Sequence, residues 1–286
     1  MCYTLLINFV VLGMVKDQYD LDYLKEVLAE IGYEFYYFPK IDSTMNIIEK
    51  SAQNGKNAFM IALTDHQTLG AGRKGRKWLD TAGNSLMFSV LFHIKESSIA
   101  TFADLVSLAI YETLRRVTGN LSIKIKYPND LVFQDKKIGG ILVKNIYDEK
   151  LHYLGTNLGI GLNIHYTKGM LQKFPTDYPA TSLDICTSSL NKRQDLLIEL
   201  LKGLRCLGAE AEVFEINSKT SELFDEKWRK ASSMMGRKVA ILKQDIPFEE
   251  GVVTNTGIGR GIELQTPGGK KWISLFDTDM KARILN

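Results

Sequence analysis

The chain has 286 residues, 45% of them hydrophobic, and its 36 Lys and Arg nearly balance its 33 Asp and Glu to leave a net charge of +3. That length suffices for one large core with a small satellite domain, and the near balance of charge excludes a broad nucleic-acid-binding surface. Three scattered cysteines and four separated histidines form neither a disulfide framework nor a C-x-x-C or H-E-x-x-H site, which predicts no metal centre and favours a reducing cytoplasm.

The amino-terminal residues 1–32 are expected to form an extension without a catalytic role. The apolar run 2–14 is shorter than the ~20 residues of a membrane span, and it lacks the basic region and cleavage site of a signal peptide. An amphipathic helix that ends at Gly32 is predicted from the spacing of Leu21, Leu24, Val27, Leu28 and Ile31. No recognition helix can be placed here, so DNA binding is not expected.

Residues 70–78 form a glycine-rich loop with four cations, Gly-Ala-Gly-Arg-Lys-Gly-Arg-Lys-Trp, after an apolar strand-like run at 59–63. Glycines let the backbone approach a ligand, and Arg and Lys supply donors matched to phosphate or carboxylate, so the loop is predicted to hold an anion. The letters also satisfy G-x-G-x-x-G, but residues 76–84 lack a helical apolar period, which excludes a dinucleotide fingerprint. A solvated basic surface loop would have the same composition.

Two later segments place polar groups and glycines at the ends of predicted strands. Residues 126–130, Lys-Tyr-Pro-Asn-Asp, end an alternating run in which Ser122, Lys124 and Lys126 share one face, and residues 134–137 predict a hairpin tip before a Gly-Gly strand start. Residues 158–164, Leu-Gly-Ile-Gly-Leu-Asn-Ile, predict a strand whose glycines lie where a ligand or another backbone comes close.

The remaining chain predicts core helices followed by short strands. Apolar positions recur at helical spacing over 100–117 and 195–216, and a further helix is expected over 222–234. From about Met235 onward the spacing of Gly and Pro turns predicts a small barrel or SH3-like domain, with strands at 238–242, 251–254, 261–264, 271–275 and 281–285.

In this order, the three segments resemble the G-R-G-R-x-G-R-x-W loop, the K-W-P-N-D-L hairpin and the G-x-G-x-N strand of the biotin protein ligases. The resemblance covers roughly residues 33 to 286. It implies an α+β fold, with helices on one face of a mixed, mainly antiparallel sheet. It also implies a catalytic domain at 33–234 and an SH3-like domain at 235–286, in a monofunctional ligase without a helix-turn-helix domain.

By this resemblance the protein would use ATP and Mg²⁺ to convert biotin to biotinyl-5′-AMP, and would then transfer biotin to a lysine of a biotin carboxyl carrier protein domain. The carrier would belong to a biotin-dependent carboxylase, the compartment would be cytoplasmic, with no membrane partner, and a homodimer is compatible with the resemblance. Two alternatives are a lipoate or octanoate ligase of the same superfamily, although its R-R-x-S-G-G-G-like segment is absent, and a non-catalytic anion- or nucleic-acid-binding module.

The resemblance also assigns residues. Lys126, bridging the biotin carboxylate and the α-phosphate, and Arg73 would be catalytic. The implied biotin-binding residues are Ser43, Thr44, Gln67, Gly70, Gly72, Arg73, Lys126, Gly140, Gly159 and Gly161. The implied ATP-binding residues are Arg73, Arg76, Trp78, Lys126, Asn163 and Arg283. Three of these have simpler explanations: Ser43 or Thr44 as an N-cap, Lys126 as a solvated strand end, and Arg283 as an exposed terminal arginine.

Two departures from the family pattern alter the expected site. Ala71 stands where an Arg or Lys is usual, so one cation that would help to close the loop over the adenylate is missing, and weaker retention of the intermediate is expected. Tyr127 replaces the usual Trp and keeps an aromatic wall with a different edge.

Overall fold

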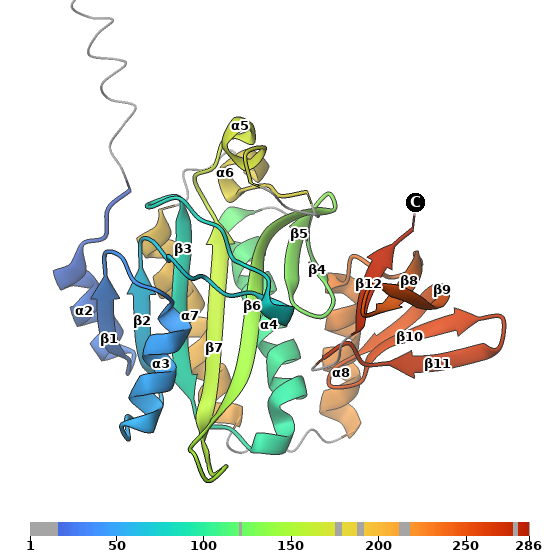
Figure 1. Ribbon diagram of the computed structural model, residues 1–286, viewed down its shortest axis with the longest axis horizontal. Helices are drawn as coiled ribbons and strands as arrows, with labels where there is room; N and C mark the ends of the chain where they lie inside the picture. Colours follow the sequence, from blue (N-terminus) through green and yellow to red (C-terminus); the bar gives the residue numbers. More distant parts are fainter. Residues whose placement is uncertain are drawn as a thin grey trace, which may run out of the picture.

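The computed structural model describes residues 17–119, 122–174, 179–187, 192–211, 218–276 and 280–285. These residues form two β-sheets with helices beside them, the larger sheet within residues 34–163 and the smaller within 238–284 (Figure 1). The apolar run 2–14 lies outside the described residues. Among the helices of the described segments, none combines the length and apolarity that a membrane crossing requires.

The larger sheet has seven strands in the order β1-β2-β3-β7-β6-β5-β4. Its first pair, β1 and β2, is parallel and the other neighbours are antiparallel, so the predicted mixed, mainly antiparallel sheet is confirmed. The strands are β1 (Glu34–Phe38), β2 (Met60–Thr64), β3 (Ser85–Phe92), β4 (Ile123–Lys126), β5 (Asp130–Phe133), β6 (Lys136–Tyr147) and β7 (Tyr153–Asn163).

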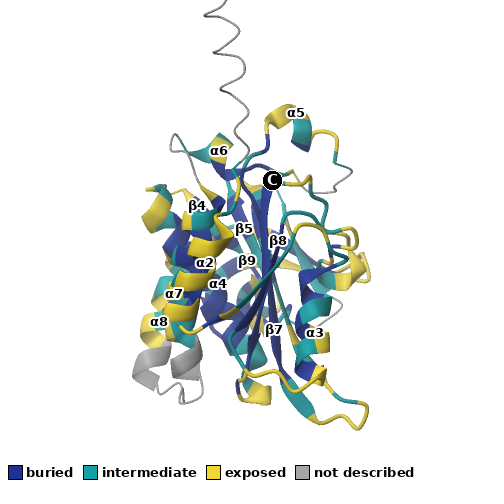
Figure 2. Ribbon diagram, turned by 90° about the vertical axis from the view of Figure 1, so that its left-hand side faces the viewer, coloured by how far each residue is buried: buried dark blue, intermediate teal, exposed yellow. Residues whose placement is uncertain are grey.

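Helices cover both faces of this sheet (Figure 2). The predicted helices α2 (Leu21–Glu30), α4 (Ile99–Thr118) and α7 (Arg193–Ala211) pack on one face and form the main core with it. The expectation of helices on one face alone needs a correction, because α3 (Thr44–Gln53) packs Ile48 and Ala52 on the other. Strands β2 and β3 are buried along their whole length, so both of their faces need cover.

The remaining helices are short or lead into the second sheet: α5 (Lys168–Leu171), α6 (Leu183–Cys186), α8 (Ser218–Ala231), and the 3₁₀ turns η2 (Arg73–Gly75) and η3 (Glu96–Ser98). The second sheet is antiparallel, in the order β11-β10-β9-β8-β12. Each predicted C-terminal strand overlaps one of its members, β8 (Lys238–Lys243), β9 (Ile246–Gly257), β10 (Gly261–Thr266), β11 (Gly269–Ile273) and β12 (Met280–Ile284).

The hairpin that carries part of the site turns at two residues. Gln134 and Asp135 have φ of 47° and 59°, and Phe133 pairs with Lys136 across them. Positive φ at both central residues is the signature of a type I′ turn, whose twist matches that of the flanking strands. The tip is therefore shorter than the predicted 134–137, which places Lys136 and Lys137 inside β6.

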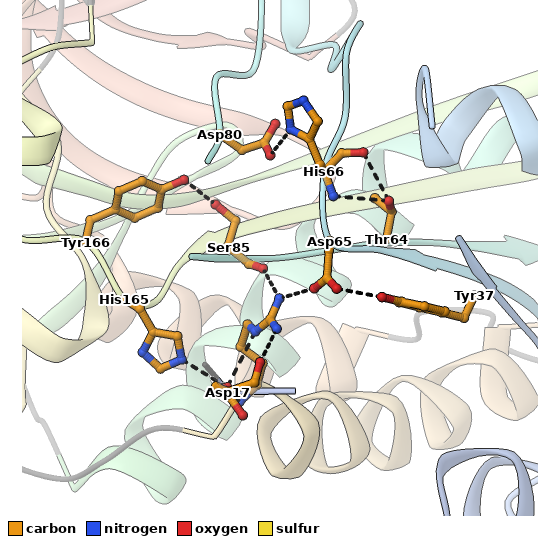
Figure 3. Close-up of polar contacts among 10 residues, drawn as sticks. Asp17, Tyr37, Thr64, Asp65, His66, Asp80, Ser85, His165 and Tyr166 are labelled. Carbon is orange, nitrogen blue, oxygen red and sulfur yellow. Dashed lines mark hydrogen bonds and ion pairs between the residues drawn. The ribbon is translucent and has the colours of Figure 1, made fainter. Parts of the chain in front are cut away.

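A cluster of charged side chains ties the first described residue to the body of the fold (Figure 3). His165 contacts Asp17 through Nε2 at 2.9 Å and Asp184 through Nδ1 at 2.8 Å. Arg193 is 1% exposed, donates from Nη1 to Asp65 Oδ1 at 2.6 Å, and also contacts Asp17. The hydrogen bond to Asp17, followed by the one to Asp184, raises the pKa of His165 although burial opposes them.

We predict that His165→Gln destabilises the protein more at about pH 6 than at about pH 9. A raised pKa in the folded state gives stability that is complete below the unfolded-state value of ~6.5 and is lost as pH rises through the folded-state value. We expect a difference on the order of 1 kcal/mol in the free energy of unfolding between the two pH values. Urea denaturation at both pH values measures it.

His152→Gln is the matched control for this measurement. His152 pairs with Asp148 on an exposed hairpin, and an exposed pair contributes little to stability. A pH-independent loss in the His165 variant would contradict the assigned role of the imidazolium.

Candidate functional site

A cavity of about 370 Å³ opens between the start of α3, the loop after β2, and strands β6 and β7. Most of the predicted site residues line it: Ser43, Thr44, Gln67, Gly72, Arg73, Arg76, Trp78, Gly140, Gly159, Gly161 and Asn163. Lys126, Gly70 and Arg283 are not among the described residues of its lining. The loop, the hairpin and the glycine strand, which are far apart in the sequence, therefore meet at one site.

The glycines of β7 give room to two large side chains of the cavity wall. A Cβ at Gly161 would lie 2.7 Å from the ring of Trp78, and a Cβ at Gly159 would lie 2.8 Å from Sδ of Met45. Both distances are too short for any other residue without displacement of the wall. The Trp78 indole N–H is buried and has no hydrogen-bond partner among the described residues, so it is a donor that a ligand could use.

A hydroxyl and amide network occupies the end of the cavity beside α3. Gln67 Oε1 accepts hydrogen bonds from the backbone N–H of Thr44 at 2.8 Å and from its hydroxyl at 3.1 Å. The Thr44 and Ser89 hydroxyls lie 2.8 Å apart. Ser43 stands at the N-cap position of α3, yet its side chain makes no capping hydrogen bond. Gln67 therefore satisfies the helix start, which weakens the explanation of the hydroxyls as simple caps.

The basic loop closes on itself as a narrow hairpin. Trp78 N donates to Gly70 O at 2.8 Å, and Gly72 N donates to Arg76 O at 2.7 Å. A Cβ at Gly70 would lie 2.8 Å from the backbone oxygen of Trp78, so this glycine allows the loop to close rather than lining the cavity. The loop contains the 3₁₀ turn η2, and no helix begins over residues 76–84 before β3, in agreement with the rejection of a dinucleotide fingerprint.

Arg73 reaches out of the loop to two other parts of the molecule. Its Nη2 donates to the backbone oxygen of Leu275 at 2.5 Å, and its Nη1 donates to Asn129 Oδ1 at 3.4 Å. Asn163 is buried, and its Nδ2 donates to Thr181 O at 3.0 Å. Arg73, the predicted catalytic arginine, thus lies between the cavity and the segment that follows β11.

Lys137 is a site residue that the sequence reasoning missed. It lines the cavity, its Nζ lies 2.5 Å from Asp130 Oδ1, and the same nitrogen lies 5.8 Å from the centre of a Trp78 ring. Its backbone is held on both sides, donating to Pro179 O at 2.7 Å and accepting from Thr181 N at 2.8 Å. Lys137 could have been found by assigning a two-residue turn to Gln134 and Asp135 in the sequence. That assignment puts Lys137 into the strand ahead of the Gly-Gly pair.

Lys126 lies at the end of β4, in register with Asp130. Burial lowers the pKa of Lys126 below its usual value. The nearby carboxylate of Asp130 raises this pKa in part, and the positive charge of Lys137 lowers it further. Lys126 is thus a partly buried side chain outside the described cavity lining and not a solvated strand end. Arg283 is exposed on β12, away from the cavity lining.

The lining combines cations with an apolar slot. Arg73, Arg76, Lys77 and Lys137 contribute positive charge, and no Asp or Glu is among the described lining residues. Apolar wall residues that are not among the predicted site residues are Met45, Leu79, Ile141, Leu142, Ile160, Phe174 and Ala180. The site therefore suits a small molecule with an apolar body, a polar end facing Thr44 and Gln67, and an anionic end at the loop.

The fold and the site define an α+β domain with a small-molecule cavity beneath a basic glycine-rich loop. Residues 37–162 match the model of the biotin/lipoate A/B protein ligase family. The chain is similar to that family over these residues.

Sequence relatives extend beyond the matched domain. The bifunctional ligase/repressor BirA of Escherichia coli K12 is 27% identical over 247 residues, covering 84% of this chain and 70% of that protein. The biotin–[acetyl-CoA-carboxylase] ligase of Mycobacterium tuberculosis is 24% identical over 225 residues, covering 77% and 76%. A solved structure of the Aquifex aeolicus biotin protein ligase with biotin and ATP superposes with a TM-score of 0.70 at 23% identity, covering 88% of this chain and 99% of that one, which shows the fold.

We predict that Gly161→Ala displaces Trp78 from the cavity wall, because the added Cβ has no space beside the indole. The overpacking should cost about 1–3 kcal/mol of folding stability and shift the Trp78 indole N–H resonance. Denaturation and the NMR spectrum of the nitrogen-labelled protein provide the two measurements. Gly169→Ala, with nothing within 4 Å of the new Cβ, is the control; an unmoved Trp78 signal in the Gly161 variant would refute the packing argument.

Proposed function

We propose that the protein is a biotin protein ligase, which forms biotinyl-5′-AMP from biotin and ATP and then transfers biotin to a lysine of a biotin carboxyl carrier protein domain. The observation that supports this most directly is that the matched family model spans the loop, the hairpin and nearly all of the glycine strand, which together build the cavity. A relative similar to most of this chain is named as a biotin ligase. The lipoate alternative is not favoured, because the relative from Mycobacterium tuberculosis is named as a ligase for biotin.

The first step joins two anions. A carboxylate oxygen of biotin attacks the α-phosphorus of ATP, the bond from that phosphorus to the bridging oxygen breaks, and pyrophosphate leaves with the electron pair. Cations are needed to offset the repulsion and to stabilise the charge that builds in the transition state. Arg73, Arg76 and Lys137 supply them at the cavity mouth.

The geometry of Lys137 makes it our first candidate for the lysine beside the reacting groups. Its ammonium faces the cavity, and the ion pair with Asp130 and the two backbone hydrogen bonds hold it in place before a ligand arrives. Such preorganisation means that little reorganisation is needed during the reaction. Lys126 remains a proposed site residue that acts through the same acid, with which it is in register.

The slot beneath the loop would take the ring system of biotin. Gln67 and Thr44 present amide and hydroxyl groups to a polar ring end, while Trp78 covers the apolar part and keeps water from the mixed anhydride. In the second step the carrier lysine attacks the acyl carbon, the amide forms, and AMP leaves. Arg283 and Asn163 are proposed to contact the nucleotide.

Mg²⁺ is proposed to enter with the nucleotide. The described residues contain no group of three or more His, Cys, Asp or Glu that could hold a metal, and Asp130, beside the site, is paired with Lys137. Magnesium at such sites is held largely by substrate phosphates and water. We therefore assign no protein residue as its dedicated ligand.

The division of labour along the chain is also a proposal. Residues 33–234 would carry the catalytic domain, residues 235–286 an SH3-like cap that contributes to the nucleotide site, and residues 1–32 an extension. The cytoplasm is the compartment that ATP use and the free thiols of Cys186 and Cys206 favour.

ATP–pyrophosphate exchange by the purified protein with Mg²⁺ tests the function, with biotin, lipoate, octanoate or no acid added. We expect exchange only when biotin is the added acid. Labelled pyrophosphate enters ATP when the adenylation of a bound acid runs in reverse, so exchange reports which acid the site activates. Exchange with lipoate or octanoate would keep the fold and change the substrate. Absence of exchange with every acid would favour the binding-module alternative.

We predict that Lys137→Met lowers kcat/KM for biotin-dependent exchange about 10²–10³-fold, the usual loss when one preorganised charge is removed from a reacting site. Lys126→Met should cost less, because Lys126 is not among the described residues that line the cavity. Circular dichroism would verify that both variants fold. A larger loss for Lys126 than for Lys137 would return the main catalytic assignment to Lys126.

A further inference from the structure

Two buried carboxylates hold the turn between β9 and β10 against the helices of the larger sheet's domain. Asp104 of α4 is 2% exposed, and its Oδ2 accepts from the backbone N–H of Gly259 at 2.8 Å. Asp225 of α8 accepts from the N–H of Ile258 at 2.9 Å and pairs with the guanidinium of Arg260. Helices α4 and α8 thus hold the turn through hydrogen bonds to two adjacent backbone N–H groups, those of Ile258 and Gly259.

The fit of this turn is close. Gly259 has a φ of +70°, and a Cβ on it would lie 2.6 Å from the Thr101 hydroxyl of α4. Only glycine suits both the positive φ and the lack of space. The turn therefore has one docked position on α4 and little freedom to slide.

The turn is continuous with the segment that holds Arg73. Strand β10 leaves the turn at Gly261, where a Cβ would lie 2.3 Å from the backbone oxygen of Ile273 at the end of β11. Two residues later, the oxygen of Leu275 accepts the 2.5 Å hydrogen bond from Arg73. Tyr127 is hydrogen-bonded to the Ser274 side chain and to the Leu275 backbone, which fixes the same segment from the side of β4.

We propose that Asp104 and Asp225 are positioning residues that set the place of Arg73 in the site, by docking the 257–261 turn and through it the 273–275 segment. Arg73 acts in the reaction only if the ligase function proposed above holds, so the catalytic consequence rests on that function. The mechanical consequence, a loop held closed by the second sheet, does not.

We call the contacts of Asp104 and Asp225 with the 257–261 turn the clamp. Its positive and negative charges are equal in number when Asp104 is neutral. Asp225 on α8 and Arg260 on the turn form an ion pair, and among the described residues Tyr127 after β4 also lies near Asp104. Burial, with Asp225 adding to it, raises the pKa of Asp104 to about 8. The acid is thus mostly protonated at neutral pH, and ionisation at higher pH places an uncompensated charge in the interface.

Limited trypsin digestion of the full-length, ligand-free protein tests the clamp, because residues 73–77 of the loop offer four cleavage positions, Arg73, Lys74, Arg76 and Lys77. We expect Asp104→Ala to raise the rate of cleavage within the loop roughly tenfold, since cleavage follows the population of the open loop. Asp104→Asn, which keeps the acceptor and is neutral, should digest as the wild type does. Leu114→Ala, a buried core change on the same helix away from the turn, controls for general destabilisation.

The digestion results test the structural role of Asp104 and Asp225 independently of the proposed ligase activity. Loop cleavage that is equally fast in Asp104→Ala and Leu114→Ala would overturn the proposal, whether or not the protein proves to be a ligase. If Asp104→Ala does not fold, Asp225→Asn gives the same readout, because it removes the charge pair with Arg260 and keeps the side-chain shape. A cleavage ratio of wild type to Asp104→Asn that stays constant from about pH 7 to about pH 9 would overturn the neutral clamp.

A second readout connects the clamp to catalysis once exchange activity is established. Asp104→Ala should raise KM for ATP more than it lowers kcat, because a displaced Arg73 weakens binding of the anionic substrate before any step of the reaction. Asp104→Asn should restore both values. Wild-type kinetics in Asp104→Ala, combined with fast loop cleavage, would overturn the link to the site.

Discussion

The packing of one indole ring against a glycine of strand β7 is the constraint on which the site depends. Trp78 lies against Gly161 at a distance that no Cβ could share, and the same residue closes the basic loop by donating from its backbone to Gly70. Wall and loop are therefore one unit, and the loop cations reach the cavity mouth only because the ring is seated. Close-packed side chains of this kind cannot shift by small steps without clashes, so we expect Trp78 and the loop to move together.

The chain gathers charge locally where its chemistry needs it. Its net charge is only +3, yet the described cavity lining holds four cations and no acid. The slot beside them is apolar, and charges at the edge of an apolar cavity act more strongly than in water. The second sheet contributes to this arrangement from outside, because the backbone oxygen of Leu275 holds Arg73. The site is thus assembled across two sheets.

Much of this could be predicted from local patterns. The helices α2, α4 and α7, the C-terminal strands and the position of the basic glycine-rich loop followed from residue types at short spacing. Lys137 was missed because a four-residue tip was expected, whereas Gln134 and Asp135 adopt positive φ and close the hairpin in two. That shift moves a lysine from a turn into a strand beside the cavity. The side of the sheet that α3 covers was equally out of reach, since β2 and β3 are apolar on both faces.

By itself, the sequence determined which elements form, which loop carries the cations and which strand carries the glycines of the site, because these depend on spacings of a few residues and on the conformational freedom of glycine. Only the tertiary structure decided which lysine faces the cavity, that Gln67 rather than Ser43 satisfies the start of α3, and that Arg73 meets an oxygen 202 residues away. These contacts depend on strand register and on the docking of one sheet against the helices of another. A change of one residue in register reverses the face of every side chain in a strand, and no short stretch of sequence records that choice.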